Sequence, residues 1–190
     1  LSRRQRQMCI RDRYGTSFDY PISAVGSHVS AVPNHQTGRI TSLHTRGVVA
    51  MAGTFGYELN LGKLSEEEKE EIRSQVEEYR KFAPLIQTGL YYRLSDPSKE
   101  EYAAWAFVSE DQKEVLLNVV MQEIHGNMTV NYVNLQGLKC SAIYRDTETG
   151  KTYNGAALME AGIPMPVEMG EFKAYQMHCL LYTSDAADDL

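Results

Sequence analysis

The clearest hydrophobic pattern in this chain is that of an amphipathic helix between Leu64 and Ile86. Ser65 followed three residues later by Glu68 is the sequence of a capping box, which marks the start of the helix. Pro84 is expected to end or kink the helix, because proline has no backbone N–H to donate. The many charged residues are expected to form its solvated face. The apolar stripe at helical spacing consists of Ile72, Val76, Tyr79 and Ala83.

Upstream of this helix, two short stretches have the composition and alternation of β-strands. Pro21 is expected to end the first, and a loop rich in Ser, Gly, Pro and Asn follows. Thr45 is placed to cap a short apolar helix, with Gly53 as its stop. The order strand, helix, strand, helix is typical of βα units. The predicted elements are a strand at 16–20, a loop at 22–42, a helix at 46–52 and a strand at 54–61.

The pattern changes near Thr88 and Gly89. From Leu90 onward the apolar runs are short, rich in β-branched and aromatic residues, and separated by polar turn clusters such as SDPSKE and DTETGK. Short strands at this spacing predict an antiparallel sandwich. The runs cover residues 90–94, 102–109, 114–122, 128–135, 141–145, 151–155 and 171–177.

The two ends of the chain differ from the rest in origin. Residues 1–13 read LSRRQRQMCIRDR and residues 179–190 read CLLYTSDAADDL. One double-stranded DNA can encode both segments. One of its strands codes for the first segment. The opposite strand, extended outward and read in another frame, codes for the second. Both are therefore interpreted as translated sequencing adapter rather than as a basic arm and an acidic tail. We expect both to be disordered and without specific contacts, and the natural chain to run from Tyr14 to His178 as a cut piece of a longer protein.

Composition narrows the classes of partner. The 190 residues carry a formal net charge of −6, which argues against a nucleic-acid partner because phosphates need basic patches. No apolar run approaches the ~18 residues that a membrane-spanning helix needs, so no membrane partner is expected. Of the three cysteines, Cys9 and Cys179 fall in the flanking segments and only Cys140 remains. A single unpaired thiol fits a reducing, cytoplasmic compartment.

Few residues carry a chemical signature on their own. Asp19 and Glu58 fall on predicted strands, and glycoside hydrolysis requires paired carboxylates, but no spacing here identifies a pair. A structural role for each carboxylate is the competing interpretation. His28, His35 and His44 match no metal template, so no metal or other cofactor is predicted.

Aromatic residues in the β-rich part offer a second hypothesis, a non-catalytic module that binds carbohydrate or mediates assembly. Trp105, with Tyr91, Tyr92 and Tyr102, could stack on the face of a sugar ring. Core packing and cross-strand pairing are the competing explanation for the same residues. Exposure of Trp105 would favour sugar binding, and burial would count against it.

Several long blocks of the chain carry a resemblance to a known family. Residues 14–47 (YGTSFDYPISAVGSHVSAVPNHQTGRITSLHTRG) and 49–72 (VAMAGTFGYELNLGKLSEEEKEEI) closely resemble α-galactosidases of glycoside hydrolase family 36. The later runs LIQTGLYYRL, WAFVSED and YNGAALMEAGIPMP keep the family order. The resemblance covers residues 14–178. It implies an α/β plus all-β architecture, with the last two βα units of a (β/α)8 TIM barrel at 14–88 and a C-terminal antiparallel β-sandwich at 89–178.

The resemblance also implies an enzymatic activity for the family. It further implies that this piece lacks the residues that carry out that activity. Family members hydrolyse terminal α-galactosides such as melibiose and raffinose with retention, through a covalent galactosyl-aspartate. The family nucleophile lies in a K-W-D-x-N string and the acid/base aspartate in an S-D-x-x-D-A string, and neither occurs here. No catalytic residue is therefore assigned to any position, and the chain is predicted to be inactive. A related transferase or α-N-acetylgalactosaminidase on the same scaffold is the alternative.

Position alone suggests which residues lie nearest the sugar pocket of the intact enzyme. Active sites of such barrels form at the C-terminal ends of the strands. The loop expected after the first strand begins at Ile22, so Ser23, Gly26, Ser27 and His28 are the candidates, with barrel scaffolding as the alternative for each. A galactoside is the expected substrate of the intact enzyme, and intact family members are expected to be homo-oligomers.

Overall fold

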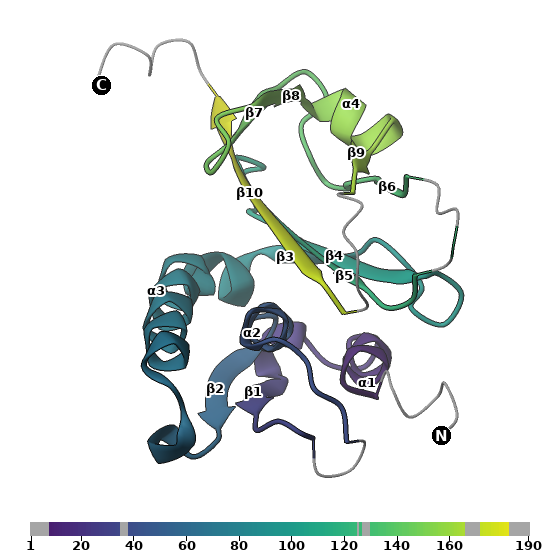
Figure 1. Ribbon diagram of the computed structural model, residues 1–190. Helices are drawn as coiled ribbons and strands as arrows, with labels where there is room; N and C mark the ends of the chain where they lie inside the picture. Colours follow the sequence, from purple (N-terminus) through teal and green to yellow (C-terminus); the bar gives the residue numbers. More distant parts are fainter. Residues whose placement is uncertain (1–7, 35–37, 125, 127–129, 166–171, 183–190) are drawn as a thin grey trace.

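The computed structural model describes residues 8–34, 38–124, 126, 130–165 and 172–182. Figure 1 shows three layers: helices and a small parallel sheet, a long antiparallel sheet across them, and a thin layer of short elements beyond it. Within the described part of the chain, no helix combines the length and apolarity that crossing a membrane requires.

The first layer contains two βα units in sequence. Strands β1 (Gly26–Ser30) and β2 (Thr54–Glu58) pair in parallel, with Gly26 opposite Thr54 and Ser30 opposite Glu58. Helix α2 (Leu43–Ala50) connects them and α3 (Glu66–Thr88) follows β2. The predicted order strand, helix, strand, helix is confirmed, although its first strand is not the predicted one. The remaining elements of this layer are α1 (Met8–Thr16) and the short helices η2 (Ile22–Ala24) and η3 (Leu61–Lys63).

The predicted first strand, at residues 16–20, is wrong. α1 runs through Thr16. The backbone N–H groups of Asp19 and Tyr20 then donate hydrogen bonds to the Thr16 carbonyl, at 3.1 and 3.0 Å, and form a turn. Tertiary contacts account for this turn. Arg93 Nε donates to Ser17 Oγ at 2.7 Å, and its guanidinium lies 4.0 Å from the centre of the Phe18 ring. The true strand, β1, lies within the stretch predicted to be a loop.

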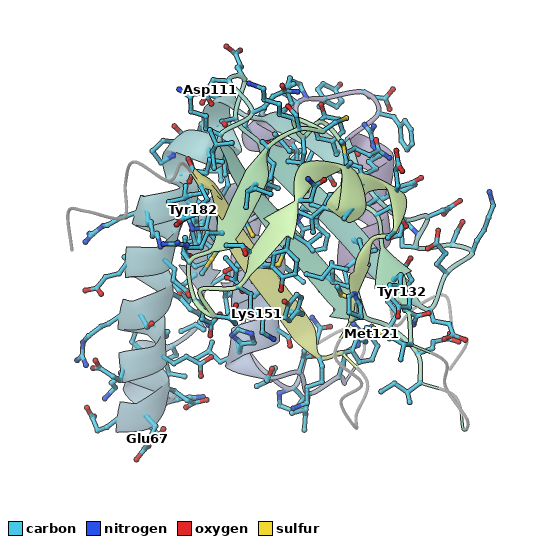
Figure 2. All side chains as sticks on the ribbon, turned by 90° about the horizontal axis from the view of Figure 1, so that it is seen from above. Glu67, Asp111, Met121, Tyr132, Lys151 and Tyr182 are labelled. Atoms are coloured by element: carbon cyan, nitrogen blue, oxygen red, sulfur yellow. The ribbon has the colours of Figure 1, made fainter. Side chains whose placement is uncertain are left out.

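Both helix starts follow from side-chain capping. Ser42, rather than the predicted Thr45, caps α2, and its Oγ accepts from the Thr45 N–H at 3.2 Å. The predicted capping box of Ser65 and Glu68 is confirmed, with Ser65 N–H donating to the Glu68 carboxylate at 2.9 Å. In Figure 2, Glu67 points into solvent at this acidic first turn, where a carboxylate favours the positive end of the helix dipole.

Pro84 does not end α3, which continues to Thr88. The Pro84 carbonyl accepts from Thr88 Oγ1 at 2.9 Å. Pro84 is exposed, so the carbonyl one turn earlier that loses its N–H donor also lies toward solvent, where water can replace the missing bond. The members of the predicted stripe are only half-buried. The residues that α3 buries most deeply are Gln75, Phe82, Leu85 and Ile86.

The antiparallel sheet has six strands in the order β3-β4-β5-β10-β7-β8. A two-stranded sheet, β6-β9, and the helix α4 lie on its far side (Figure 1). The β-rich prediction is confirmed, while the predicted run at 128–135 contributes only β6, and residues 128–129 lie outside the described part. The elements are β3 (Leu90–Arg93), β4 (Tyr102–Val108), β5 (Glu114–Met121), β6 (Tyr132–Val133), β7 (Ile143–Asp146), β8 (Thr152–Asn154), α4 (Gly155–Glu160), β9 (Ile163–Pro164) and β10 (Ala174–Tyr182).

The two faces of this sheet build two different cores. One face packs with Tyr144, Leu158 and Ile163 under the thin outer layer. The other face packs directly on the βα units, and this second core joins both parts of the chain. The βα part supplies Ile22, Ala52, Phe82, Leu85 and Ile86, and the sheet supplies Ala103, Trp105, Phe107, Leu116 and Val120. Because they share a core, the two parts are expected to unfold together, contrary to a division into independent units at Gly89.

The flanking segments make specific contacts where the structure describes them, so the prediction that they make none is wrong for residues 8–13 and 179–182. Ile10 packs against the shared core, and Cys179 is fully buried, pairing with Val115 of β5 and Asp146 of β7. The physical reason is that β10 lies between two strands whose backbone groups pair with any extension of it. Residues 1–7 and 183–190 lie outside the described part.

Two glycines of the parallel layer allow a matched test of packing. A Cβ on Gly53 would lie 2.3 Å from the Val25 carbonyl oxygen, which already accepts from Thr54 N–H at 2.9 Å. Gly53→Ala is therefore expected to lower the free energy of unfolding by about 3 kcal/mol, as overpacking against backbone does. A Cβ on Gly56 would meet nothing within 4 Å, so Gly56→Ala is expected to be neutral or stabilising by up to about 1 kcal/mol. Urea denaturation of both variants checks this, and equal effects would contradict it.

Candidate functional site

The parallel sheet has one covered face and one open face. Val29 of β1 is fully buried and packs with Leu43 and Ala50 of α2, and Tyr57 of β2 donates from its hydroxyl to Gln75 Oε1 at 2.8 Å. Successive side chains on a strand point to opposite faces. The alternate positions therefore lie on the face away from the helices, called the open face below. It consists of Gly26, His28 and Ser30 on β1 and Thr54, Gly56 and Glu58 on β2.

A histidine and a carboxylate meet on the open face. His28 Nε2 lies 2.8 Å from Glu58 Oε2, with 55% of the His28 side chain and 76% of the Glu58 side chain exposed. His28 is directly opposite Gly56 in the register, and Glu58 lies two residues further along β2. A Cβ on Gly56 would meet nothing within 4 Å, so the space over this residue is open. Glu58 is the last residue of β2, and His28 is the central residue of β1. Active sites of (β/α)8 barrels lie at the C-terminal ends of the strands.

The four residues predicted to lie near the sugar are placed differently from one another. Ser23 belongs to η2, before β1, and Gly26 is the first residue of β1, so both lie at the N-terminal end of the strand. Ser27 is buried on the covered side and accepts a hydrogen bond from Arg13. His28, the central residue of β1, is the only one of the four whose side chain lies on the open face. None of them lies in a loop after β1.

Of the two candidate carboxylates, only Glu58 lies on a strand. Asp19 is exposed in the turn after α1. Ser30, the last residue of β1 and the register partner of Glu58, is a member of the open face that sequence reasoning missed. The signal that could have found it is the period of two around Val29, the sole large apolar residue of GSHVS, which places Ser30 and His28 on the opposite face.

Of the three histidines considered for a metal site, the two that the structure describes lie on different elements. His28 is on β1, His44 is exposed on α2, and His35 lies outside the described residues. Among the residues that the structure describes, no group of three or more His, Cys, Asp or Glu side chains is arranged to hold a metal ion.

The aromatic residues considered for sugar stacking mostly face the interior. Trp105 is 6% exposed and belongs to the shared core. Tyr91 packs against the same core, its ring centre 5.4 Å from that of Phe107, and burial raises the pKa of its hydroxyl to about 12. Tyr92 and Tyr102 pack against the other face of the sheet. This burial counts against a sugar-binding surface around Trp105.

Parallel βα units with helices on one face, followed by an antiparallel sheet packed on those helices, define the class of protein: an α/β scaffold joined to a β-domain. Family models agree with both parts. The Melibiase model matches residues 7–89, and the glycosyl hydrolase family 36 C-terminal domain model matches residues 102–179. The chain belongs to glycoside hydrolase family 36.

Curated relatives of this chain are α-galactosidases. It is 58% identical over 166 residues to the bifunctional α-galactosidase/sucrose kinase AgaSK of Mediterraneibacter gnavus, covering 87% of this chain and 18% of the relative. It is 45% identical over 163 residues to the α-galactosidase AgaA of Geobacillus stearothermophilus, covering 86% of this chain and 22% of the relative. The chain therefore spans about a fifth of the length of these relatives.

Solved structures give the same result for the fold. The galactosidase domain of AgaSK superposes with a TM-score of 0.91 at 54% identity, covering 93% of this chain and 25% of that one. A variant of the Geobacillus stearothermophilus enzyme AgaA in complex with raffinose superposes with a TM-score of 0.90 at 41% identity, covering 93% of this chain and 24% of that one. The match includes both the βα units and the antiparallel sheet, since either alone is too short to reach this coverage.

Proposed function

We propose that this chain is the C-terminal part of a retaining α-galactosidase that acts on terminal α-D-galactosides of the raffinose type. Its βα units are the last two of the catalytic (β/α)8 barrel, and its antiparallel sheet belongs to the C-terminal β-sandwich. The observation that carries this proposal is the match of one family model to each part, together with relatives whose names state α-galactosidase activity. The raffinose complex of one such relative supports the substrate class.

The open face provides the part of the sugar pocket that this chain supplies. In a barrel the helices lie outside, so the face opposite α2 and α3 is the interior. His28 and Glu58 would then lie near the mouth of the barrel. A hydrogen bond between an imidazole and one oxygen of a carboxylate fixes the orientation of both groups. The second carboxylate oxygen stays free to accept from a hydroxyl. We assign Glu58 to the wall of the sugar pocket and His28 to holding its carboxylate in place. Neither is proposed as nucleophile or general acid.

Two further proposals concern the location and the assembly of the intact enzyme. The exposed thiol of Cys140 fits a cytoplasmic, reducing location. Homo-oligomer formation of the intact enzyme stays a prediction. No residue of this chain distinguishes hydrolysis from transfer. The names of the relatives favour hydrolysis.

Joining this chain to the missing part of the barrel tests the proposal. A single polypeptide would consist of an α-galactosidase relative up to the point where the match begins, followed by residues 14–178. The joined protein is expected to release galactose from raffinose and from a chromogenic α-galactoside. In it, Glu58→Gln is expected to raise KM more than it lowers kcat, whereas Glu77→Gln on the exposed face of α3 should change neither. A folded joined protein with no galactosidase activity would contradict the proposal.

A further inference from the structure

We infer that Phe172, which precedes β10, is a positioning residue for the sugar pocket, because its ring and its carbonyl hold the connection between β1 and α2. The described residues of this connection are 31–34 and 38–42. The inference rests on the proposed function, since the active sites of barrels are built from the loops at the C-terminal ends of the strands. It adds that the antiparallel sheet, and not the barrel alone, sets the position of one of these loops.

One arginine of α2 fixes both ends of the connection. Arg46 Nη1 donates to the carbonyl of Ser30, the last residue of β1, at 2.6 Å. Arg46 Nε donates to the Thr41 carbonyl, close to the start of α2, at 3.0 Å. These bonds lie within the βα units, so they determine where the connection leaves β1 and where it enters α2. The part between the two ends depends on other contacts.

The part between the ends is held by the antiparallel sheet. Its two arms are bonded to each other, because Asn34 N–H donates to the Arg39 carbonyl at 2.9 Å and Gly38 N–H donates to the Asn34 carbonyl at 2.7 Å. The guanidinium of Arg39 lies 4.6 Å from the centre of the Phe172 ring, within the range of a cation–π contact. Phe172 therefore contacts one arm and, through it, orders the other.

A second contact joins Phe172 to the start of α2. Thr45, which is 3% exposed, donates from its hydroxyl to the Phe172 carbonyl at 2.7 Å. Thr45 Oγ1 also accepts from the hydroxyl of Ser42, the N-cap of α2, at 3.0 Å. α2 and the beginning of β10 thus lie side by side (Figure 1). Arg39, Thr45 and Phe172 are together called the brace below.

The backbone of Phe172 is held in an unusual conformation. Its φ of 60° lies in the left-handed region, which bulky residues rarely adopt. Phe172 N–H donates to the carbonyl of Met121 on β5 at 2.9 Å, and Met121 N–H donates to the Lys173 carbonyl at 3.0 Å. The ladder of the sheet therefore fixes the residue that presents its ring to Arg39 and its carbonyl to Thr45. Glycine adopts this φ more easily, so the ring is what phenylalanine contributes here.

The braced connection begins beside the pocket wall proposed above. Ser30, the residue before it, is the register partner of Glu58 across the parallel sheet. A shift of the connection would change the shape of the pocket near Glu58, but it would move no reacting group, since no catalytic residue is assigned to this chain. Loss of the brace is therefore expected to weaken substrate binding more than it slows the chemical step.

Hydrogen exchange on the full chain, residues 1–190, tests the brace without requiring activity. Phe172→Gly removes the ring, keeps the carbonyl and suits the local φ, and Arg39→Met removes the cation. In each variant the amides of Asn34 and Gly38 are expected to exchange about tenfold faster, while the melting temperature stays nearly unchanged. Lys81→Met is the matched control, because it removes another cation from an aromatic ring, 5.2 Å away on α3, and should leave these rates unchanged. Unchanged exchange in both brace variants would overturn the inference.

Kinetics of the joined protein with raffinose test the link to the sugar. Phe172→Gly and Arg39→Met are each expected to raise KM about fivefold and to change kcat less than about twofold, while Phe172→Tyr, which keeps the ring, should retain the original KM. Combining the first two should add little to either alone, because both remove the same contact. An active joined protein whose KM neither variant changes would overturn the inference and leave the proposed function intact. An inactive joined protein would contradict the proposed function, and the exchange rates of the full chain would still decide whether the brace orders the connection.

Discussion

The purified chain is expected to hydrolyse a chromogenic α-galactoside more than about 10⁴-fold more slowly than the joined protein, because loss of a catalytic nucleophile alone has effects of this size. Neither the K-W-D-x-N nor the S-D-x-x-D-A string is present in its sequence. A retaining mechanism requires two carboxyl groups about 5 Å apart, one to attack and one to donate a proton. The single carboxylate of the open face, Glu58, is held by His28.

Initial rates over a wide range of chain concentration measure this residual activity. The Glu58→Gln variant, purified in parallel, is the control for contaminating host enzyme. Any trace of activity should be the same in both preparations. Turnover within about a hundredfold of the joined protein that is lost in Glu58→Gln would mean that the chain has a catalytic carboxylate of its own, contrary to the prediction.

Phe82→Ala is expected to lower the free energy of unfolding by about 3–5 kcal/mol, the usual range for truncating a buried phenylalanine. Phe82 is 4% exposed and belongs to the core shared by α3 and the antiparallel sheet. Its ring centre lies 5.0 Å from that of His178 on β10. The cavity would lie between the two parts of the chain, so the loss should appear in both parts at once.

Denaturation followed by hydrogen exchange measures the coupling. Amide protection in β1 and β2 should fall together with that in β4 and β5, because the two parts share one core. Leu61→Ala, at a side chain that is 57% exposed, is the control and should change stability by less than about 0.5 kcal/mol. Phe82→Leu removes less volume and serves if Phe82→Ala does not fold. Loss of protection confined to the βα units would show that the sheet is stable without them.

Local signals in the sequence predicted the elements whose structure is decided locally. The capping box of Ser65 and Glu68 fixes the start of α3 because both partners lie within one turn. The long apolar runs of β4 and β5 predicted strands because those strands are buried on both faces. Where long-range contacts decide, local pattern failed: TSFDY has strand-like residues, but Arg93, more than 70 residues away, holds Ser17 in a turn.

The sequence pointed to His28 and Glu58 as candidate residues, but it did not predict the strand or the sheet face on which they meet. β1 has five residues, of which only Val29 is large and apolar, so its composition is that of a loop. Missing this strand shifted the expected pocket toward Ser23 and Gly26, at the N-terminal end. The pairing of His28 with Glu58 depends on the parallel register of two strands that a helix separates in the sequence. The sequence alone does not show this register, so it could not predict the pair. The extension of β10 through Cys179 to Tyr182 likewise depends on its neighbours, since β5 and β7 pair with whatever follows.

α3 ends at Thr88 and β3 begins at Leu90, with Gly89 alone between them. A Cβ on Gly89 would lie 2.5 Å from the Leu85 carbonyl oxygen and 3.0 Å from that of Val108, so even this residue is enclosed. Genetic recombination between domains succeeds where a flexible linker separates two cores, and no such linker exists here. A crossover at Gly89 would attach the antiparallel sheet to a foreign helix and leave Trp105 and Phe107 without their partners. The βα units and the antiparallel sheet are therefore expected to be inherited together, as one exchangeable unit that begins upstream of β1.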